Sequence, residues 1–226
     1  FLVSLLVVKF GKIDSVHKGI FSSAFTCSNN MFIGVPVALS LFGEQALIPT
    51  LFYFFANTTF FWTIGNFLEA RDGALVSHAP LKPLFSWESL RRVFSPPFCG
   101  FLTALFCVII NWRPPEFIMT SAKYMGGITS PLALIFIGLM LYRIGIRNIR
   151  FNRDLSWVFA GRFLVSPLIC LGLSLLFPIS PEFAKVYVIQ AALPCITQIA
   201  VLAKFHHADA KFATTCVAST TLGCLI

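Results

Sequence analysis

The chain alternates long apolar runs with short polar connections. Six runs are long enough to cross a hydrocarbon core of about 30 Å as helices. They lie at residues 18–43, 47–68, 94–112, 117–142, 155–178 and 182–205. Shorter apolar runs at 1–10 and 209–226 are typical of spans cut by the ends of a sequence. The pattern predicts an all-α integral membrane protein, and we expect the sequence to be a fragment of a longer chain.

A polar interruption divides the first long run. Ser28, Asn29 and Asn30 precede Gly34 and Pro36 at a depth where hydrocarbon would surround a lipid-facing helix. A proline inside a helix costs about 3 kcal/mol, and unpaired amides in lipid cost more. Such a break persists only where protein encloses it, and broken spans often mark transport sites. We predict that Asn29, Asn30, Gly34 and Pro36 belong to a substrate site, although the two amides could instead only satisfy backbone groups freed by the proline.

A similar interruption lies in the run 182–205. Amides flank Pro194 in the segment that ends at Thr197 and Gln198. We predict Pro194, Thr197 and Gln198 as further residues of the substrate site. Proline alone proves little, because transmembrane helices carry it more often than soluble helices do. The combination of a central position, amides and small residues distinguishes these two breaks.

The two breaks occupy corresponding places in the chain. The longest polar connection, 69–93, divides the sequence into a first part, 1–68, and a second part, 94–226. Each break falls in the span before the last one of its part. An odd number of spans in each half makes two such repeats inverted with respect to the membrane. We therefore predict two inverted repeats joined by a linker at 69–93.

Composition and charge agree with a membrane protein. Hydrophobic residues make up 57% of the chain, and charged residues make up 12%, against about 25% in soluble domains. Most of the 17 basic residues fall in connections on one side of the membrane, whereas only Arg113 and Lys185 fall on the other. Loops rich in basic residues remain in the cytoplasm, so this distribution predicts which side of the membrane each loop faces. It also explains the net charge of +8 without a nucleic-acid partner, which we do not expect. The predicted cytoplasmic loops of this inner (plasma) membrane protein are 9–18, 69–93, 143–154 and 204–211.

Two cations, Lys123 and Arg162, lie inside apolar runs. Each either extends to the nearest interface or faces inward and offsets the charge of an anionic substrate. All nine acidic residues read as loop or span-end residues, which argues against a cation pump with a central carboxylate. No Ser-His-Asp order, HExxH, P-loop or GxGxxG occurs in the chain, so nothing predicts an enzyme or ATP coupling. The seven cysteines show no spacing typical of disulfides or zinc sites.

The sequence around the first interruption resembles that of a known family. The segment SNNMFIGVPVALSLFGEQAL (28–47) is similar to the signature of the auxin efflux carrier family, and the segments at 130–146 and 191–223 resemble its later regions. The resemblance implies ten spans in two inverted five-span repeats, with the fourth and ninth spans crossing at their prolines. On that template 1–68 holds the end of span 3 and spans 4 and 5, and 94–226 holds spans 6 to 10.

The family includes plant auxin exporters and bacterial permeases for malate, malonate and similar carboxylates. No long hydrophilic insert separates the halves here, so the bacterial permeases are the better comparison. The resemblance implies a secondary transporter of small organic anions that works by alternating access. The partners expected for this chain are the organic anion, the lipid bilayer and a second copy in a homodimer. The coupling ion would be H⁺ or Na⁺, with no other cofactor. A sodium-coupled symporter of the bile-acid type and a seven-helix membrane sensor or receptor remain as alternatives.

Overall fold

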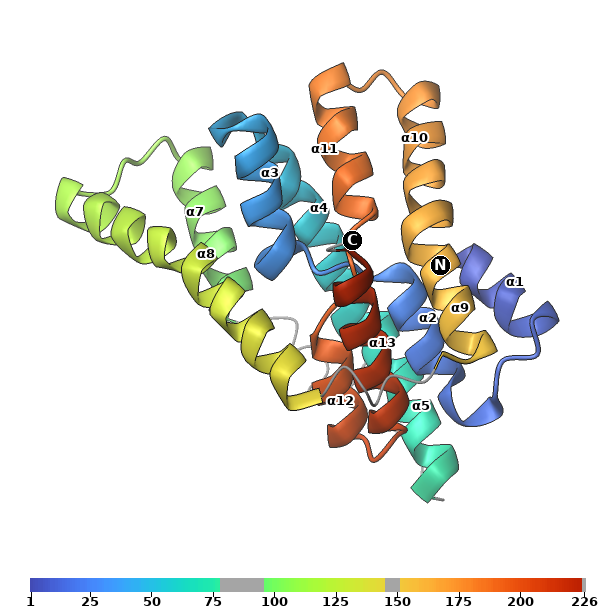
Figure 1. The fold of residues 1–226 in the computed structure, drawn as a ribbon. Helices are drawn as coiled ribbons and strands as arrows, with labels where there is room; N and C mark the ends of the chain where they lie inside the picture. The colour runs from blue at the N-terminus through green and yellow to red at the C-terminus, as the bar shows by residue number, and fades with distance from the viewer. Residues whose placement is uncertain (78–95, 145–150, 225–226) are drawn as a thin grey trace.

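The computed structural model describes residues 1–77, 96–144 and 151–224. Within these ranges the chain forms helices joined by short connections (Figure 1). An isolated antiparallel β-bridge between Ser28 and Cys195 is the one element of β-structure in the described residues. The prediction of an all-α chain is therefore confirmed.

Most helices follow the predicted apolar runs. The π-helical turn η4 (Phe61–Gly65) joins α4 to α5, and the π-helical turn η6 (Gly161–Val165) joins α9 to α10. Such turns occur mainly inside α-helices and often at functional sites. The other helical elements outside the broken runs are α1 (Leu2–Phe10), η1 (Ser15–His17), η3 (Glu44–Ala46), α4 (Leu47–Phe60), α5 (Asn66–Ser77), α7 (Pro96–Ile109), α8 (Glu116–Ile144), α9 (Arg153–Ala160), α10 (Ser166–Leu176) and α13 (Ala210–Cys224).

The two runs with polar interruptions are split into separate helices. The run 18–43 forms α2, then the π-helical turn η2, then α3, and the run 182–205 forms α11 and α12. Their bounds are α2 (Lys18–Thr26), η2 (Asn30–Gly34), α3 (Val35–Phe42), α11 (Pro181–Ala191) and α12 (Gln198–Phe205). Helix α2 has nine residues and is about 14 Å long. Each half is thus too short to cross a bilayer alone, whereas the described helices Glu44–Ser77 and Arg153–Leu176 are long and apolar enough to do so.

The helix that begins in the apolar run 47–68 is longer than the sequence pattern indicated. The predicted linker begins at residue 69, yet α5 continues to Ser77. Glu69 and Asp72, expected at a span end and in a loop, are both fully buried. The reason is tertiary packing, because this part of α5 lies against α2. The rest of the predicted linker, 78–93, lies outside the described residues.

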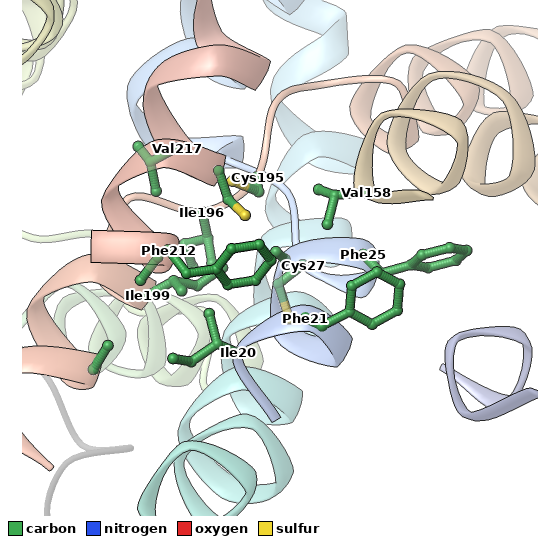
Figure 2. Packing of buried hydrophobic residues seen from close by; sticks show 14 of the residues in the cluster. Ile20, Phe21, Phe25, Cys27, Val158, Cys195, Ile196, Ile199, Phe212 and Val217 are labelled. Carbon is green, nitrogen blue, oxygen red and sulfur yellow. The ribbon is translucent and has the colours of Figure 1, made fainter. Parts of the chain in front are cut away.

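Helix α2 lies at the centre of the buried core. Phe21 and Phe25 of α2 pack with Val158 of α9 and Val217 of α13, and Cys195 of the second break joins the same cluster (Figure 2). Dense packing of this kind resists changes in volume. The core therefore fixes the position of the first broken helix relative to α9, α12 and α13.

The outer surface is apolar. Helix α10 has no buried residue, and its Leu168 and Leu175 are 63% and 80% exposed. Extended apolar surface of this kind marks contact with lipid or with other protein. The connections α3 to α4, α7 to α8 and α10 to α11 lie at the upper end in Figure 1, and the α12 to α13 connection lies at the lower end. The side of the membrane that each end faces remains a prediction.

Candidate substrate-binding site at the helix crossing

The two interruptions meet and pair through their backbones. The Asn29 N–H donates a hydrogen bond of 2.9 Å to the carbonyl of Pro194, and the Ile196 N–H donates one of 3.0 Å to the carbonyl of Cys27. Backbone groups that leave a helix inside a membrane must find partners within the protein. Here each extended segment supplies partners for the other, which explains how both breaks are tolerated at one place.

Arg162 satisfies the carbonyls that the two breaks leave at helix C-termini. Its side chain is fully buried, and its guanidinium makes five hydrogen bonds of 2.8 to 3.3 Å. The acceptors are the carbonyls of Phe25 and Thr26 at the end of α2, and of Ala191 and Leu193 at the end of α11. A cation at a helix C-terminus also interacts favourably with the helix dipole. Arg162 thus joins both broken helices through backbone atoms alone.

Asn57 of α4 pairs with the first extended segment. Its Oδ1 accepts a hydrogen bond of 3.0 Å from the Ser28 N–H, and its Nδ2 donates one of 3.0 Å to the Ser28 carbonyl. The side-chain amide therefore takes the place of a neighbouring strand. This contact fixes the crossing to α4, on the side opposite to the pairing with Pro194.

The amides of Asn30 and Gln190 connect the two broken helices. Asn30 Nδ2 donates to Gln190 Oε1 at 3.1 Å, and Gln190 Nε2 donates to the Gly34 carbonyl at 3.0 Å and to Thr50 Oγ1 at 3.3 Å. Asn29 Oδ1 accepts a longer bond of 3.4 Å from the Phe32 N–H at the start of η2. Each of the adjacent asparagines keeps one buried polar atom, Asn29 Nδ2 and Asn30 Oδ1, that has no hydrogen-bond partner among the described residues.

Gly34 permits the close approach of Gln190. A Cβ at position 34 would collide with Gln190 Oε1 and would come within 2.8 Å of Leu193 Cδ1. We expect Gly34→Ala to displace Gln190 from Asn30 and to lower the stability by about 1–3 kcal/mol, as overpacking does. The apparent melting temperature of the full-length protein in detergent measures this effect. Gly172→Ala on α10, where a Cβ meets open space, is the matched control, and an equal effect of the two changes would contradict this account.

A pocket of about 250 Å³ opens at the crossing. Its wall combines side-chain amides and hydroxyls with aromatic and aliphatic groups, as ligand pockets commonly do. The polar residues of the wall are Ser28, Asn29, Asn30, Asn57, Thr58 and Gln198. The apolar residues are Met31, Phe32, Phe54, Trp62 and Ile196.

The ends of the broken helices are sorted around this pocket. Asn30, the first residue of the continuous η2 and α3 helix, lines the pocket, and so does Gln198, the first residue of α12. The C-terminal ends of α2 and α11 instead meet Arg162. Helix N-termini carry a partial positive charge that favours anions. At η2 the Asn30 N–H donates to the Ser28 carbonyl and the Phe32 N–H donates to Asn29 Oδ1, so the helix dipole acts on the pocket without these two N–H groups. The pocket therefore receives both positive helix ends, and the negative ends are neutralised elsewhere.

The structure brings most of the residues predicted from the breaks to one place. Asn29, Asn30 and Gln198 line the pocket. The Gly34 carbonyl accepts a hydrogen bond from Gln190, which also binds Asn30. The Pro194 carbonyl accepts the Asn29 N–H, so this proline acts through its backbone. The predicted role of these residues in substrate binding remains a prediction.

Pro36, Thr197 and the two cations stand outside the pocket wall. Pro36 is the second residue of α3 and directly follows the π-helical turn η2, and the break itself is at residues 27–29. Thr197 is buried, and its hydroxyl donates to Gln198 Oε1 at 3.2 Å. Lys123 is exposed on α8, so the structure does not bring it to the crossing. Arg162 lies at the crossing, but its guanidinium is occupied by backbone carbonyls rather than open to a substrate.

Two residues of the crossing were not among the predicted site residues. Asn57 and Gln190 each make two or more hydrogen bonds to the broken segments. Both are single amides within apolar runs, where an unpaired amide is costly. This cost indicates that each amide has a hydrogen-bond partner inside the protein, and it could have marked both residues as part of a site. Their partners could not be predicted from the sequence. Ser28 is 29 residues from Asn57, and Gly34 is 156 residues from Gln190.

Comparisons with known proteins agree on a transport family. A family profile described as membrane transport protein matches residues 1–226. The chain is 31% identical over 204 residues to an uncharacterized transporter of Methanothermobacter thermautotrophicus, covering 88% of this chain and 62% of the relative. It is 26% identical over 196 residues to an uncharacterized transporter of Methanocaldococcus jannaschii, covering 85% of this chain and 60% of the relative.

The chain thus spans about three fifths of the length of these two curated relatives. The family match extends over both broken helices and the helices around them. The all-helical fold and the apolar exterior are in keeping with a protein embedded in a membrane. The chain belongs to the membrane transport protein family, which is the auxin efflux carrier family that its sequence resembles.

Proposed function

We propose that the full-length protein is a secondary transporter of small organic anions, with carboxylates as the substrate class. The sorting of helix ends at the crossing carries this proposal. The N-termini of the η2 and α3 helix and of α12 meet the pocket, whereas Arg162 binds the carbonyls at the opposite ends of the broken helices. Two positive helix ends favour an anion over a cation.

The side chains of the pocket add a means of recognition. Asn29 Nδ2 is a buried donor without a partner among the described residues, and a carboxylate oxygen is a strong acceptor for it. Phe32, Phe54 and Trp62 provide apolar wall, which suits the carbon skeleton of a small organic acid. Malate, malonate and related acids are the first candidates, on the strength of the family.

Alternating access would move the crossed helices relative to the helices around them. Inverted repeats in other transporters place the substrate near the midplane and expose it to each side in turn. The pocket is small, at about 250 Å³, so modest movement of α3 or α12 would change its exposure. In this proposal the basic loops face the cytoplasm of the inner membrane, the driving ion is H⁺ or Na⁺, and no catalytic step takes place.

A flux assay with the full-length protein in liposomes tests the proposal. The panel consists of labelled mono- and dicarboxylates, each beside its uncharged amide analogue and an organic cation of similar size. We expect flux of at least one carboxylate, and little flux of its amide or of the cation, because the pocket favours negative charge. Parallel assays with and without sodium and a pH gradient identify the driving ion. Equal flux of an acid and its amide, or flux of the cation alone, would overturn the proposal.

A further inference from the structure

Glu69 on α5 is a buried carboxyl that the crossing does not use. Its exposed fraction is 0%. Neither of its carboxylate oxygens has a hydrogen-bond partner in the part of the chain that the structure describes. An ionised carboxylate buried without a partner costs several kcal/mol. A group of this kind inside a membrane protein is by default a candidate functional site.

The most extensive contact of α5 is with α2, which is the first half of the crossed helix. Gly19 permits this contact, because a Cβ there would collide with the carbonyl of Leu68. About one helical turn after Gly19 on α2, the Ser23 hydroxyl lies beside Glu69. Ser23 is also fully buried, and its Oγ makes no hydrogen bond of standard geometry within the described residues. The Glu69 carboxyl and the Ser23 hydroxyl thus form a closed polar site between the two helices.

Asp72 lies three residues after Glu69, on the same face of α5. Its Oδ2 accepts hydrogen bonds from the Gly19 N–H at 2.6 Å and from the Ile20 N–H at 2.9 Å. Asp72 therefore holds the N-terminus of α2, where an anion interacts favourably with the helix dipole. Two ionised carboxylates this close are unfavourable. The arrangement favours an ionised Asp72 and a neutral Glu69.

The elements packed against α5 bring further charged groups to its vicinity. None of them donates a hydrogen bond to Glu69. The other titratable and charged residues on these elements and on α5 itself are Arg71 on α5, Lys18 on α2, His17 on η1, Lys204 on α12 and His206 directly after α12. His17 is engaged by Asp154, with Nε2 2.9 Å from Oδ2. Among the described residues, no hydrogen bond from a cation therefore offsets the charge of an ionised Glu69.

We propose that Glu69, together with Ser23, is a proton-binding site that couples protonation to the position of α2. A proton needs one carboxyl, whereas a hard metal cation prefers six or more oxygen ligands. Glu69, Ser23 and the unpartnered Asp72 Oδ1 offer four oxygens at most, and Asp72 Oδ2 is already engaged. The neutral acid permits the close contact of α2 with α5. Ionisation requires water or separation of the helices, so release of the proton accompanies movement of the crossed helix. This coupling rests on the proposed function, in which that movement is the transport step.

Infrared spectroscopy of the full-length protein tests the site independently of transport. We expect the wild type to show a carboxylic-acid C=O band at neutral pH that is lost in Glu69→Gln, which has the shape of the neutral acid. Glu44→Gln, at an exposed carboxyl of η3, should leave the band unchanged. Gel filtration establishes that each variant is folded, and Glu69→Asp provides a second titratable variant. The same intensity in the acid C=O region for the wild type and Glu69→Gln would mean that Glu69 is not a neutral acid, which overturns the proposal.

Flux in liposomes under an imposed pH gradient tests the coupling. We expect wild-type carboxylate flux to rise several-fold with the gradient, and flux through Glu69→Gln to be independent of it. An equal response of the two proteins would overturn the coupling. Absence of carboxylate flux in the wild type would instead count against the proposed function, and the infrared band would still decide whether Glu69 binds a proton.

Discussion

Replacing Arg162 by methionine is expected to destabilise the protein by about 3 kcal/mol or more, because each hydrogen bond that involves a charged group contributes about 1.5–3 kcal/mol. The change removes five hydrogen bonds and leaves the carbonyls of Phe25, Thr26, Ala191 and Leu193 without these donors. A buried carbonyl that loses its partner bears the full desolvation cost. The loss should appear as a lower melting temperature of the full-length protein in detergent and as a smaller folded fraction on gel filtration.

Two further variants separate charge from geometry at this position. Arg162→Lys keeps the charge but offers three donors from a single nitrogen, so we expect a stability between those of the wild type and Arg162→Met. Lys123→Met is the matched control. Lys123 is the second cation that lies inside an apolar run, but its side chain is exposed on α8. If Arg162→Met were as stable as Lys123→Met, Arg162 would not hold the crossing together.

Replacing both Asn29 and Asn30 by alanine is expected to reduce carboxylate flux to the background of empty liposomes. The double change removes the unpartnered Asn29 Nδ2 and the link from Asn30 to Gln190. A hydrogen bond to a charged group contributes about 1.5–3 kcal/mol, or roughly tenfold to a hundredfold in binding. The measurement is initial uptake of the best carboxylate from the panel, normalised to folded protein.

Single variants and a control make this result interpretable. Asn29→Ala alone should lower flux with a small effect on melting temperature, because its side chain makes one long hydrogen bond. Asn30→Ala should lower both, because Asn30 joins Ser28 and Gln190. Gln45→Ala removes an exposed amide of η3 and should change neither. A folded double variant with wild-type flux would mean that these amides are structural only.

The sequence was sufficient to locate the broken helices. Hydropathy identified the apolar runs, and amides beside Gly34 and Pro36 stood out because polar groups are costly in hydrocarbon. The same reasoning applied to Pro194 and Gln198, and the structure places the two breaks side by side. A rule based on proline alone would have placed the first break too far along the chain. The extended residues precede η2, and Pro36 follows that turn as the second residue of α3.

The partners of the buried polar side chains could not be predicted. Arg162 is separated by 136 residues from Thr26 and by 31 from Leu193, so no local pattern links it to carbonyls of both broken helices. A cation in an apolar run reads equally well as a substrate partner or as a residue that extends to the interface. The structure shows a third possibility, because helix breaks create unpaired carbonyls that a guanidinium can satisfy.

Glu69 illustrates a different limit of the sequence. The segment from Glu69 to Ser77 contains Glu69, Arg71 and Asp72, and a local charge pattern of this kind is typical of a loop or a solvated helix end. Packing against α2 overrides that pattern, since Asp72 binds the N-terminus of α2 and Gly19 lets the helices approach. The buried acid is thus a consequence of tertiary structure.

The most direct test of the central claim is equilibrium binding of the best carboxylate to the full-length protein in detergent, compared between the wild type and Asn29→Asp. The substitution preserves the shape of the side chain and places a negative charge where the two helix N-termini favour an anion. We predict that the carboxylate binds to Asn29→Asp at least about tenfold more weakly, a change of about 1.4 kcal/mol. Equal affinity, or tighter binding to the variant, would contradict an anion site at the helix crossing.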